Sequence, residues 1–507
     1  MRFSRRELLR VAGASACLAG PACMSPRPEM KVLPSAAPLP APFSVPLPIP
    51  PVARPVRSDA STDFYEIAVR SAAARILPGL ETAIWGYDGI FPGPTIEARS
   101  GRKVSLRLKN RLPIPIVHHL HGGRTEPGSD GYPTDLILPE GGFPSGHPHD
   151  PLARIAQGQR EHVYENRQRA ATLWYHDHRM DFTGAQVWRG LAGLYILRDD
   201  EEERLPLPRG AREMPLVICD RSFAADGSLR YPALDPGLVS TPGVAHEFAG
   251  GVMGDVILVN GAPWPRLEIA NVKYRFRILN ASNARRYELE LDPPPEGGTA
   301  FEQIGSDGGL LPAPIGHRTL RIAPAERFDV VVDFARFPAG SQVTLINRAG
   351  VGRTRNIMRF DIVGAERDEA PVPAVLSASE MPERRHAVTI REFDFGYQRF
   401  GSGWTINGKA FDPARMDARP RLDTVEIWRL KTDFSHPLHL HLVHFQVLSH
   451  SGRPGPYDAG WKDTLDLGPG QAAEILVRFS GYRGRYVFHC HNLEHEDMGM
   501  MGNFEVV

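Results

Sequence analysis

Strand-like runs separated by turn-forming residues set the strongest limit on how this chain can fold. From about residue 60 onward, runs of four to eight residues rich in Val, Ile, Leu and Phe are separated by Gly, Pro, Asn or Asp. The clearest runs are FYEIAV (64–69), VSLRLKN (104–110), DVILVNG (255–261), YRFRILNAS (274–282), RFDVVVDF (327–334) and QVTLINR (342–348). Short strands at this spacing are typical of β-sandwiches and Greek-key barrels. With 49 Gly and 47 Pro residues to form turns, they predict an all-β protein with few helical segments, residues 181–190 (DFTGAQVWRG) being one.

Two charged stretches containing Pro divide this pattern. They are residues 198–214 (RDDEEERLPLPRGAREM) and residues 364–385 (GAERDEAPVPAVLSASEMPERR). A chain of 507 residues has room for about two to four domains of ordinary size. We therefore expect three units. Their limits are residues 59–203 (the first unit), 211–366 (the middle unit) and 380–507 (the third unit).

The N-terminus has the composition of an export signal. Arg5 and Arg6, followed by Leu8 and Leu9, fit a twin-arginine signal over residues 1–25. The alternative is an ordinary secretory signal with incidental arginines. The apolar run is too short to span a bilayer as a permanent helix. We expect export to the periplasm by the twin-arginine route, with secretion or lipid anchoring as alternatives.

Residues 26–58, rich in Pro and Ala, are expected to form an extended linker. Lys+Arg and Asp+Glu balance at 59 each, so no overall field draws the protein toward nucleic acid or anionic lipid. Sequence alone does not settle the oligomeric state, and we expect a monomer.

The four cysteines do not form a disulfide framework. Cys17 and Cys23 lie in the export segment, where one could carry a lipid, although the residues before them match a lipid-attachment box poorly. Cys219 lies in the apolar run PLVICD and is most simply a buried small hydrophobe. Only Cys490 is then left in the mature domains, and it needs another explanation.

Four short histidine clusters supply that explanation, and they occur only in the first and third units. They are His118-His119-Leu120-His121, His176-Asp177-His178, His436-Pro437-Leu438-His439-Leu440-His441, and His489-Cys490-His491 with His495 and Met500 after it. Residues two apart on a strand point to the same face, so each His-x-His pair presents two imidazoles about 7 Å apart. One such pair could be structural. Eight imidazoles packed without metal would leave many polar nitrogens unsatisfied, so four pairs predict neighbouring metal ions.

Cys490 points away from its two histidine neighbours. A thiolate, two imidazoles and a weak axial thioether form the ligand set of a blue-copper electron-transfer site. His436, Cys490, His495 and Met500 provide that set. The covalent path through the tripeptide would join this site to the cluster of imidazoles. Such an arrangement accepts electrons singly and can collect the four that reduction of O2 to water requires.

The four motifs resemble those of the multicopper oxidases, most closely the branch of bacterial spore-coat laccase, bilirubin oxidase and phenoxazinone synthase. They read HLHGG followed by SDGYP, then WYHDH, HPLHLHLVHF and HCHNLEHEDMGMM, in the same order as in that family. The resemblance spans roughly residues 60–507. It implies three cupredoxin-like Greek-key β-barrel or sandwich domains and O2 as the electron acceptor. It also implies four coppers per chain, one of type 1, one of type 2 and two of type 3.

The resemblance also assigns the ligands. His119 and His439 would hold the type 2 copper, His121, His176 and His491 one type 3 copper, and His178, His441 and His489 the other. The trinuclear cluster would then lie between the first and third units, with the middle unit as a spacer. The two glycines that follow His121 select His119 and His121 from the first cluster, so His118 is expected to be structural.

Two acidic residues are candidate proton donors, because reduction of O2 to water consumes protons. Acids at the positions of Glu496 and Asp130 assist oxygen reduction in the resembling oxidases. With Cys490 as the electron relay, these three are the predicted catalytic residues. The alternatives are that Glu496 merely pairs with a nearby cation and that Asp130 shapes a turn.

The remaining histidines and methionines carry weaker signals. His147 and His149 could bind a surface metal, but a solvated loop is the expected interpretation. His444 is expected beside the ligands or in the core, and Met498 and Met501 need not be ligands.

Together these features predict an exported laccase-like enzyme that oxidises phenols or aromatic amines one electron at a time. The donor is expected to react near His495, the ligand expected nearest the surface. Bilirubin oxidation, phenoxazinone-type coupling and oxidation of cuprous or manganese ions are alternatives, although the twelve methionines form no methionine-rich insert. A non-catalytic cupredoxin scaffold or copper store is the alternative from another class. The expected partners are O2 and a small-molecule donor, without nucleic acid or a transmembrane segment.

Overall fold

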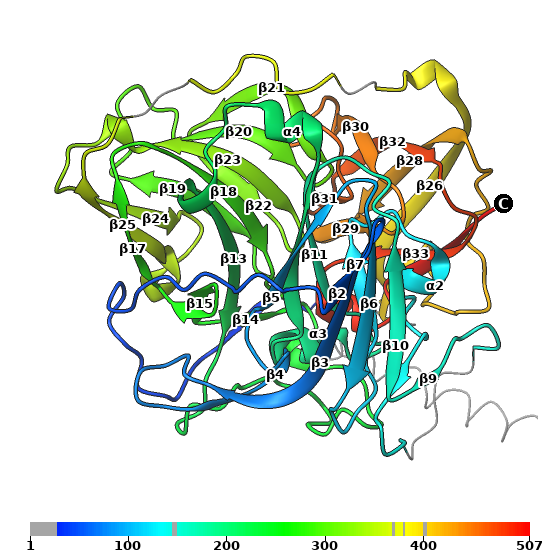
Figure 1. Ribbon diagram of the computed structural model, residues 1–507. Coiled ribbons are helices and arrows are strands. Elements are labelled where there is room, and N and C mark those ends of the chain that lie inside the picture. The colour runs from blue at the N-terminus through cyan, green and yellow to red at the C-terminus, as the bar shows by residue number, and fades with distance from the viewer. Residues whose placement is uncertain (1–27, 144–149, 368–370, 379–380, 399–402) are drawn as a thin grey trace, which may run out of the picture.

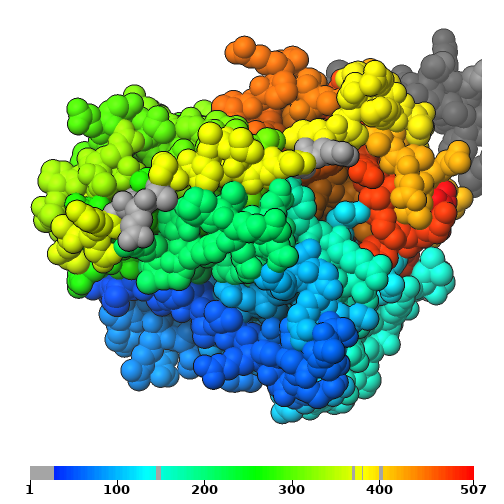
Figure 2. Space-filling view, turned by 45° about the horizontal axis from the view of Figure 1, so that its top comes forward, coloured from blue at the N-terminus to red at the C-terminus, as the bar shows by residue number. Residues whose placement is uncertain are grey.

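The computed structural model describes residues 28–143, 150–367, 371–378, 381–398 and 403–507 (Figure 1). The predicted export signal with Cys17 and Cys23 lies outside the described residues, as do His147 and His149. In Figure 2 the first unit (blue to cyan), the middle unit (green) and the third unit (orange to red) occupy separate parts of the surface.

The first unit consists mainly of two sheets, ordered β10-β6-β3-β2, with β4 on β3, and β5-β12-β11-β7. Their strands are β2 (Arg57–Ser58), β3 (Thr62–Ala74), β4 (Thr82–Tyr87), β5 (Gly93–Arg99), β6 (Lys103–Asn110), β7 (His118–His121), β10 (Gln159–Tyr164), β11 (Ala171–Asp177) and β12 (Ala192–Arg198). A short pair, β8 (Ile137–Leu138) and β9 (Ala156–Gln157), lies beside them. The inward side chains of the two sheets, among them Ile67, Leu106 and Tyr195, form one buried core.

The middle unit has a seven-stranded sheet, β16-β15-β13-β18-β23-β20-β21, and a five-stranded sheet, β17-β25-β24-β19-β22. The strands are β13 (Glu213–Arg221), β15 (Val256–Val259), β16 (Ala262–Pro263), β17 (Arg266–Ala270), β18 (Lys273–Asn280), β19 (Tyr287–Asp292), β20 (Phe301–Ser306), β21 (Gly309–His317), β22 (Leu320–Ile322), β23 (Arg327–Asp333), β24 (Gln342–Asn347) and β25 (Asn356–Gly364). Cys219 is buried in the core of this unit, as predicted.

The third unit repeats the two-sheet plan, with β27-β26-β28-β32-β30 and β31-β29-β33-β34. The strands are β26 (Ala387–Gln398), β27 (Gly403–Ile406), β28 (Thr424–Thr432), β29 (His436–Leu440), β30 (Phe445–His450), β31 (Thr464–Leu467), β32 (Ala472–Phe479), β33 (Gly484–Cys490) and β34 (Met501–Val506). Cys490 and Met500 belong to its core.

The three units share a crossover topology. In each, an early strand pairs in parallel with a later one, namely β3 with β6, β13 with β18, and β26 with β28. Parallel neighbours need a crossover connection, so none of these units is a simple meander. The α-helices of the described residues are short: α2 (Pro127–Asp130), α3 (Thr183–Trp188), α4 (Asp200–Arg204) and α5 (Leu493–Asp497). The predicted all-β class is confirmed. The six predicted runs fall on strands, and α3 lies within residues 181–190.

The Pro- and Ala-rich segment that precedes the first unit is extended, but it is packed rather than free. Its strand β1 (Lys31–Leu33) pairs in parallel with β14 (Val252–Gly254) near the middle unit. Ser35 bonds Asp255, and isolated bridges join Pro46 to Arg266 and Val52 to Thr95. Composition predicts the extended backbone of such a segment but not the surface on which it packs.

Candidate metal centres

The strand register brings histidines from different clusters opposite one another. His119 on β7 faces His176 on β11, and His439 on β29 faces His489 on β33. Three of the four His-x-His pairs run past the end of their strands, because His178, His441 and His491 follow the last strand residue. The predicted pairing of imidazoles is therefore made at strand ends.

Eight imidazoles converge in one buried cluster between the first and third units. Their nitrogens form three groups, each lying within 4.8 Å: His119 with His121 and His439, His121 with His176 and His491, and His178 with His441 and His489. Rings from the two units stack directly, with centroids 3.8 Å apart for His119 and His441 and 3.6 Å apart for His121 and His439. The structure thus brings together all eight histidines that the sequence assigned to one cluster.

The hydrogen bonds of these rings suit metal binding. Nδ1 of His119 donates to the carbonyl of Asp130 (2.6 Å), and Nδ1 of His439 donates to that of Asp463 (2.9 Å). The Nε2 atom of each ring then carries a lone pair, yet it is buried with no hydrogen-bond partner among the described residues. A buried nitrogen without a partner is costly, and a metal ion satisfies it.

A second trio of nitrogens also indicates a metal site. Nδ1 of His489 donates to the carbonyl of Cys490 (3.1 Å), so its Nε2 is an acceptor. That atom lies 3.2 Å from Nε2 of His178 and 3.3 Å from Nε2 of His441. Nδ1 of His441 is engaged by a carboxylate, so its Nε2 also carries a lone pair. Acceptors cannot bond one another, whereas one metal ion between them satisfies all three.

Burial also keeps these rings in the form that binds metal. It lowers the pKa of His119, His121, His176, His178, His439, His441 and His491. The imidazoles are therefore neutral near pH 7, as ligation requires.

A separate trio surrounds the Cys490 thiol. Sγ of Cys490 lies 3.3 Å from Nδ1 of His436 and 3.6 Å from Nδ1 of His495, and these two nitrogens are 3.1 Å apart. Burial raises the pKa of the thiol, so a bound metal would be needed to hold it as a thiolate. Met500 is buried in the same core, and its backbone N–H donates to the carbonyl of His495 (3.0 Å). Three of the four predicted ligands, His436, Cys490 and His495, therefore meet at one point, and Met500 lies in the same core.

The tripeptide His489-Cys490-His491 connects the site around the Cys490 thiol with the cluster of eight imidazoles. His489 belongs to the trio with His178 and His441, and His491 to the trio with His121 and His176. Cys490 belongs to the separate trio with His436 and His495. Alternation along β33 thus makes the tripeptide a covalent junction between a sulfur site and a cluster of imidazoles.

Comparison with known proteins decides the family. Residues 68–202 and residues 377–507 match two family models, each described as multicopper oxidase. The chain is also 37% identical over 519 residues to the laccase of Bacillus subtilis (strain 168), covering 90% of this chain and 97% of that protein. This chain belongs to the multicopper oxidase family.

Further comparisons agree with this assignment. Bilirubin oxidase of Albifimbria verrucaria is 36% identical over 468 residues, which cover 87% of this chain and 76% of that protein. The crystal structure of a laccase from Pediococcus acidilactici Pa5930 superposes with a TM-score of 0.79 at 30% identity, covering 95% of this chain and 96% of that one. The predicted cupredoxin-like architecture is confirmed by such structural neighbours, and family membership implies copper as the metal.

His495 does not reach the surface of this oxidase, contrary to the expectation for the donor site. Its ring is fully buried and stacks on Trp404 with centroids 3.6 Å apart. Nε2 of His495 donates to the carbonyl of Gly250 (3.1 Å), and Nε1 of Trp404 donates to that of Ala249 (2.9 Å). The ring is covered because β27 and a loop that precedes β14 close over it. The half-buried ring of Tyr397 also packs against Trp404, tilted by 60° with ring centroids 4.8 Å apart.

The two predicted acids both touch the imidazole cluster of the oxidase. Oδ2 of Asp130 lies 2.7 Å from Nδ1 of His441. Glu496 lies 3.0 Å from Nδ1 of His489 and 3.3 Å from Nδ1 of His178. Burial raises the pKa of Asp130. For Glu496 the same burial is outweighed by His178 and His489, which hold its pKa at about 2.

The ion pair between Asp463 and Arg327 of this oxidase was not predicted from the sequence. Oδ1 of Asp463 lies 3.1 Å from Nε2 of His121, and the guanidinium of Arg327 contacts both carboxylate oxygens. Burial opposes ionisation of Asp463, but Arg327 lowers the pKa of that carboxyl below its usual range. The available signal was a pair of adjacent charged residues at the start of each of two strands, Glu326-Arg327 and Lys462-Asp463. The middle unit is therefore more than a spacer, since it supplies Arg327.

Two further histidines lie outside the cluster. Nδ1 of His118 lies 3.2 Å from the hydroxyl of Tyr87, and its ring packs against His162, which agrees with a structural role. Nε2 of His444 donates to the carbonyl of Gly122 (3.0 Å), so this residue lies beside the ligands, as expected.

Proposed function

We propose that this multicopper oxidase couples one-electron oxidation of phenols or aromatic amines to the four-electron reduction of O2 to water. The observation that carries the proposal is the junction at His489-Cys490-His491, where a buried sulfur site adjoins eight buried imidazoles. That combination can take electrons singly and use them together. The kinship with laccases and a bilirubin oxidase supports O2 and a small-molecule donor as its substrates.

The proposed cofactor is four coppers per chain, which supply the one-electron redox chemistry when bound. His436, Cys490, His495 and Met500 would hold the type 1 copper, His119 and His439 the type 2 copper, and His121, His176, His491, His178, His441 and His489 the type 3 pair. Among the described residues, every buried imidazole nitrogen without a hydrogen-bond partner belongs to a ring in these sets, apart from the two nitrogens of His162, and this supports the sets.

The residues around the ligands have separable roles. The carbonyls of Asp130 and Asp463 hold the proton on Nδ1 of His119 and His439, which fixes the ring orientations. The carboxyl group of Asp130, whose pKa burial raises, would hold a proton for water formation, and the carboxylate of Glu496 would relay protons to the imidazole cluster. Cys490 would relay electrons through its covalent bonds to both neighbouring histidines.

The cover over His495 favours aromatic donors. Trp404, Tyr397 and Phe434 pack together beside His495, with ring centroids 4.8 Å and 5.6 Å from Trp404. An aromatic ring packs well on such a surface, whereas cuprous or manganese ions prefer sulfur or carboxylate ligands. Bilirubin oxidation and metal-ion oxidation remain the alternatives for the donor.

Oxygen uptake across a donor panel tests the function. The panel contains a phenol, an aminophenol, bilirubin, Cu(I) and Mn(II). Copper-loaded protein should be intensely blue and consume O2 with the phenol or the aminophenol. Cys490→Ser should remove the colour and the oxygen uptake together. Protein that binds four coppers but consumes no O2 with any of these donors would instead be a copper store or scaffold.

We further propose the domain limits 59–203, 211–366 and 380–507, which the grouping of strands into three pairs of sheets supports. Export through the twin-arginine route to the periplasm is also proposed, as is a monomeric state. In the described residues, no helix has the length and apolarity needed to cross a membrane. Fractionation of cells that carry an Arg5→Lys, Arg6→Lys variant tests the route, and sedimentation tests the monomer.

A further inference from the structure

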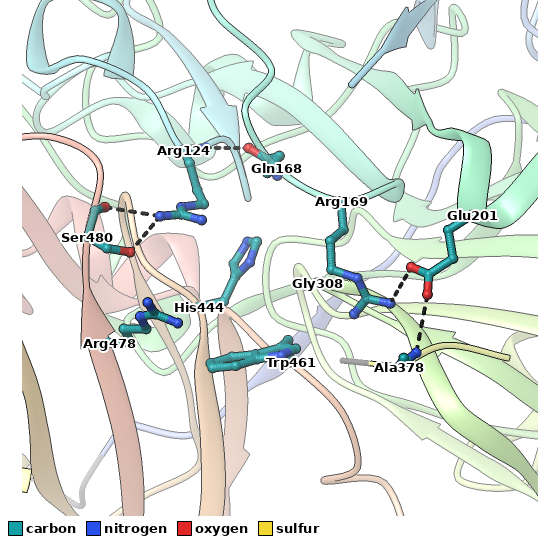
Figure 3. A pocket seen from close by; sticks show the side chains of 10 residues that line it. All are labelled: Arg124, Gln168, Arg169, Glu201, Gly308, Ala378, His444, Trp461, Arg478 and Ser480. Carbon is teal, nitrogen blue, oxygen red and sulfur yellow. Dashed lines mark hydrogen bonds and ion pairs between the residues drawn. The ribbon is translucent and has the colours of Figure 1, made fainter. Parts of the chain in front are cut away.

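A cavity of about 630 Å3 opens where the three units meet. Its main lining residues are Arg124 and Arg169 of the first unit and His444, Trp461, Arg478 and Ser480 of the third (Figure 3). In Figure 2 the surface is hollowed where cyan, yellow and orange to red segments adjoin. A volume of this size is typical of sites for small organic molecules.

The charges around the cavity do not balance. Arg169 pairs with Glu201 (3.4 Å). Arg124 instead donates to the backbone carbonyl (3.2 Å) and the hydroxyl (2.6 Å) of Ser480, using Nη2 for both bonds. Among the described residues, no carboxylate forms an ion pair with Arg124 or with Arg478. Two guanidinium groups without a counter-ion therefore face one cavity.

An anion in the cavity would stabilise this arrangement. Burial and the nearby charge of Arg478 both lower the pKa of Arg124, which means that its charged form is destabilised. An oxyanion between the two guanidinium groups would remove that penalty, because their N–H groups match a carboxylate or phosphate in pairs. Figure 3 shows the indole of Trp461 below the two arginines, where its face can pack against an apolar group attached to the anion.

The cavity also contacts the support of the imidazole cluster. His444, in its wall, donates from Nε2 to the carbonyl of Gly122, the residue after His121. The same Nε2 atom lies 4.0 Å from Oδ2 of Asp463, whose Oδ1 holds His121. A bound anion beside His444 would therefore act two contacts away from a predicted copper ligand.

We propose that this cavity is a binding site for an oxyanion, which Arg124 and Arg478 hold and which His444 couples to the imidazole cluster. The oxyanion could be free inorganic phosphate or the carboxylate of a small aromatic acid. The size of the cavity and the position of Trp461 favour the aromatic acid. This site is distinct from the cover over His495, where the donor is proposed to react.

Titration calorimetry on the copper-loaded protein tests the site. Sodium phosphate and sodium benzoate serve as probes in separate runs, with ionic strength matched by NaCl. We expect saturable binding of one anion per chain. Affinity should fall by about tenfold or more in Arg478→Gln and in Arg124→Gln, since each variant loses a charge-assisted hydrogen bond. Arg453→Gln, an exposed arginine outside the cavity, should bind like the wild type.

The two probes distinguish the sources of the anion. Tighter binding of benzoate identifies an aromatic acid as the occupant, and binding of phosphate alone identifies free phosphate. Arg478 is exposed on β32, so its variant keeps the test valid if Arg124→Gln fails to fold. Absence of saturable binding for both anions would overturn the proposal, as would equal affinity in the wild type and Arg478→Gln. Because anion binding is measured without turnover, its presence or absence says nothing about the proposed oxidase activity.

Discussion

Arg327 of the middle unit and Asp463 of the third unit form a buried two-point ion pair directly beside His121. Arg327 also donates to the carbonyl of Thr172 in the first unit (2.9 Å). Both side chains of the pair are fully buried. The contact therefore ties the three units together at the base of the imidazole cluster and fixes the orientation of a predicted ligand.

Asp463→Asn should destabilise the oxidase and weaken its imidazole cluster. Removal of one partner from a buried pair costs about 3–5 kcal/mol. Asp307, 3.6 Å from Arg327, would compensate part of the remaining charge, so we expect a loss near the lower end of that range. Denaturant unfolding should register that loss, and copper analysis should show fewer than the wild-type number of coppers. The blue colour should remain, because the carboxylate of Asp463 contacts His121 of the imidazole cluster, whereas the Cys490 thiol lies against His436 and His495.

The matched control for this variant is Asp63→Asn. Asp63 also pairs with an arginine, Arg102, but near the surface, where such pairs contribute about 0–1 kcal/mol. Equal effects of the two variants would show that the Arg327 pair has no special role.

Glu213 should make the stability of the oxidase depend on acid pH. Burial opposes its ionisation, but Arg277, Arg275 and Arg198 lower its pKa from 4.5 to about 2. A carboxyl group whose pKa is lower in the folded protein than in the unfolded protein stabilises the fold at pH values above its unfolded-state pKa. That stabilisation is lost as the pH falls through the folded-state pKa. The shift corresponds to about 3 kcal/mol, lost between about pH 4.5 and pH 2.

Glu213→Gln should therefore lower the unfolding free energy at neutral pH and flatten its decline below about pH 4.5. Unfolding by denaturant at several pH values measures both effects. Glu203→Gln, which removes a surface pair with Arg99, should leave the pH profile of the wild type. A profile that is as steep in Glu213→Gln as in the wild type would assign the acid loss to other groups.

Local patterns predicted the parts of this oxidase that are formed within single segments. Alternation on β33 placed Cys490 opposite His489 and His491, and short apolar runs located the strands. The pair of Arg327 and Asp463 could not be found in this way, because the residues are 136 positions apart and lie in different units. The cover over His495 escaped prediction for the same reason, since Gly250 lies in the middle unit and Trp404 in the third. Sequence patterns thus identified the chemistry of the ligands but not their burial.

The extended segment before the first unit should contribute to stability through two leucines. Leu33 and Leu47 are only 7% and 8% exposed, and each packs into a core outside its own segment. Truncation of a buried leucine costs about 2–5 kcal/mol, so Leu33→Ala and Leu47→Ala should each lower the unfolding free energy measurably. Ile49→Ala is the control, because Ile49 is 48% exposed and its loss should have little effect. Identical unfolding curves for all three variants would mean that the segment does not contribute to the folded state.

Trp404 should control both the stability and the reduction potential of the Cys490 site. Its ring stacks on His495 and its indole N–H holds the carbonyl of Ala249, so Trp404→Leu leaves a cavity and admits water to the site. The unfolding free energy should fall by about 3 kcal/mol. The potential should also fall, because water stabilises the more highly charged oxidised site. Redox titration of the blue absorption measures the potential.

Trp428→Leu is the control, since Trp428 is equally buried in the core of the third unit without touching His495. That variant should lose stability and keep the wild-type potential, whereas a potential unchanged in Trp404→Leu would show that the stacked ring does not shield the site from water.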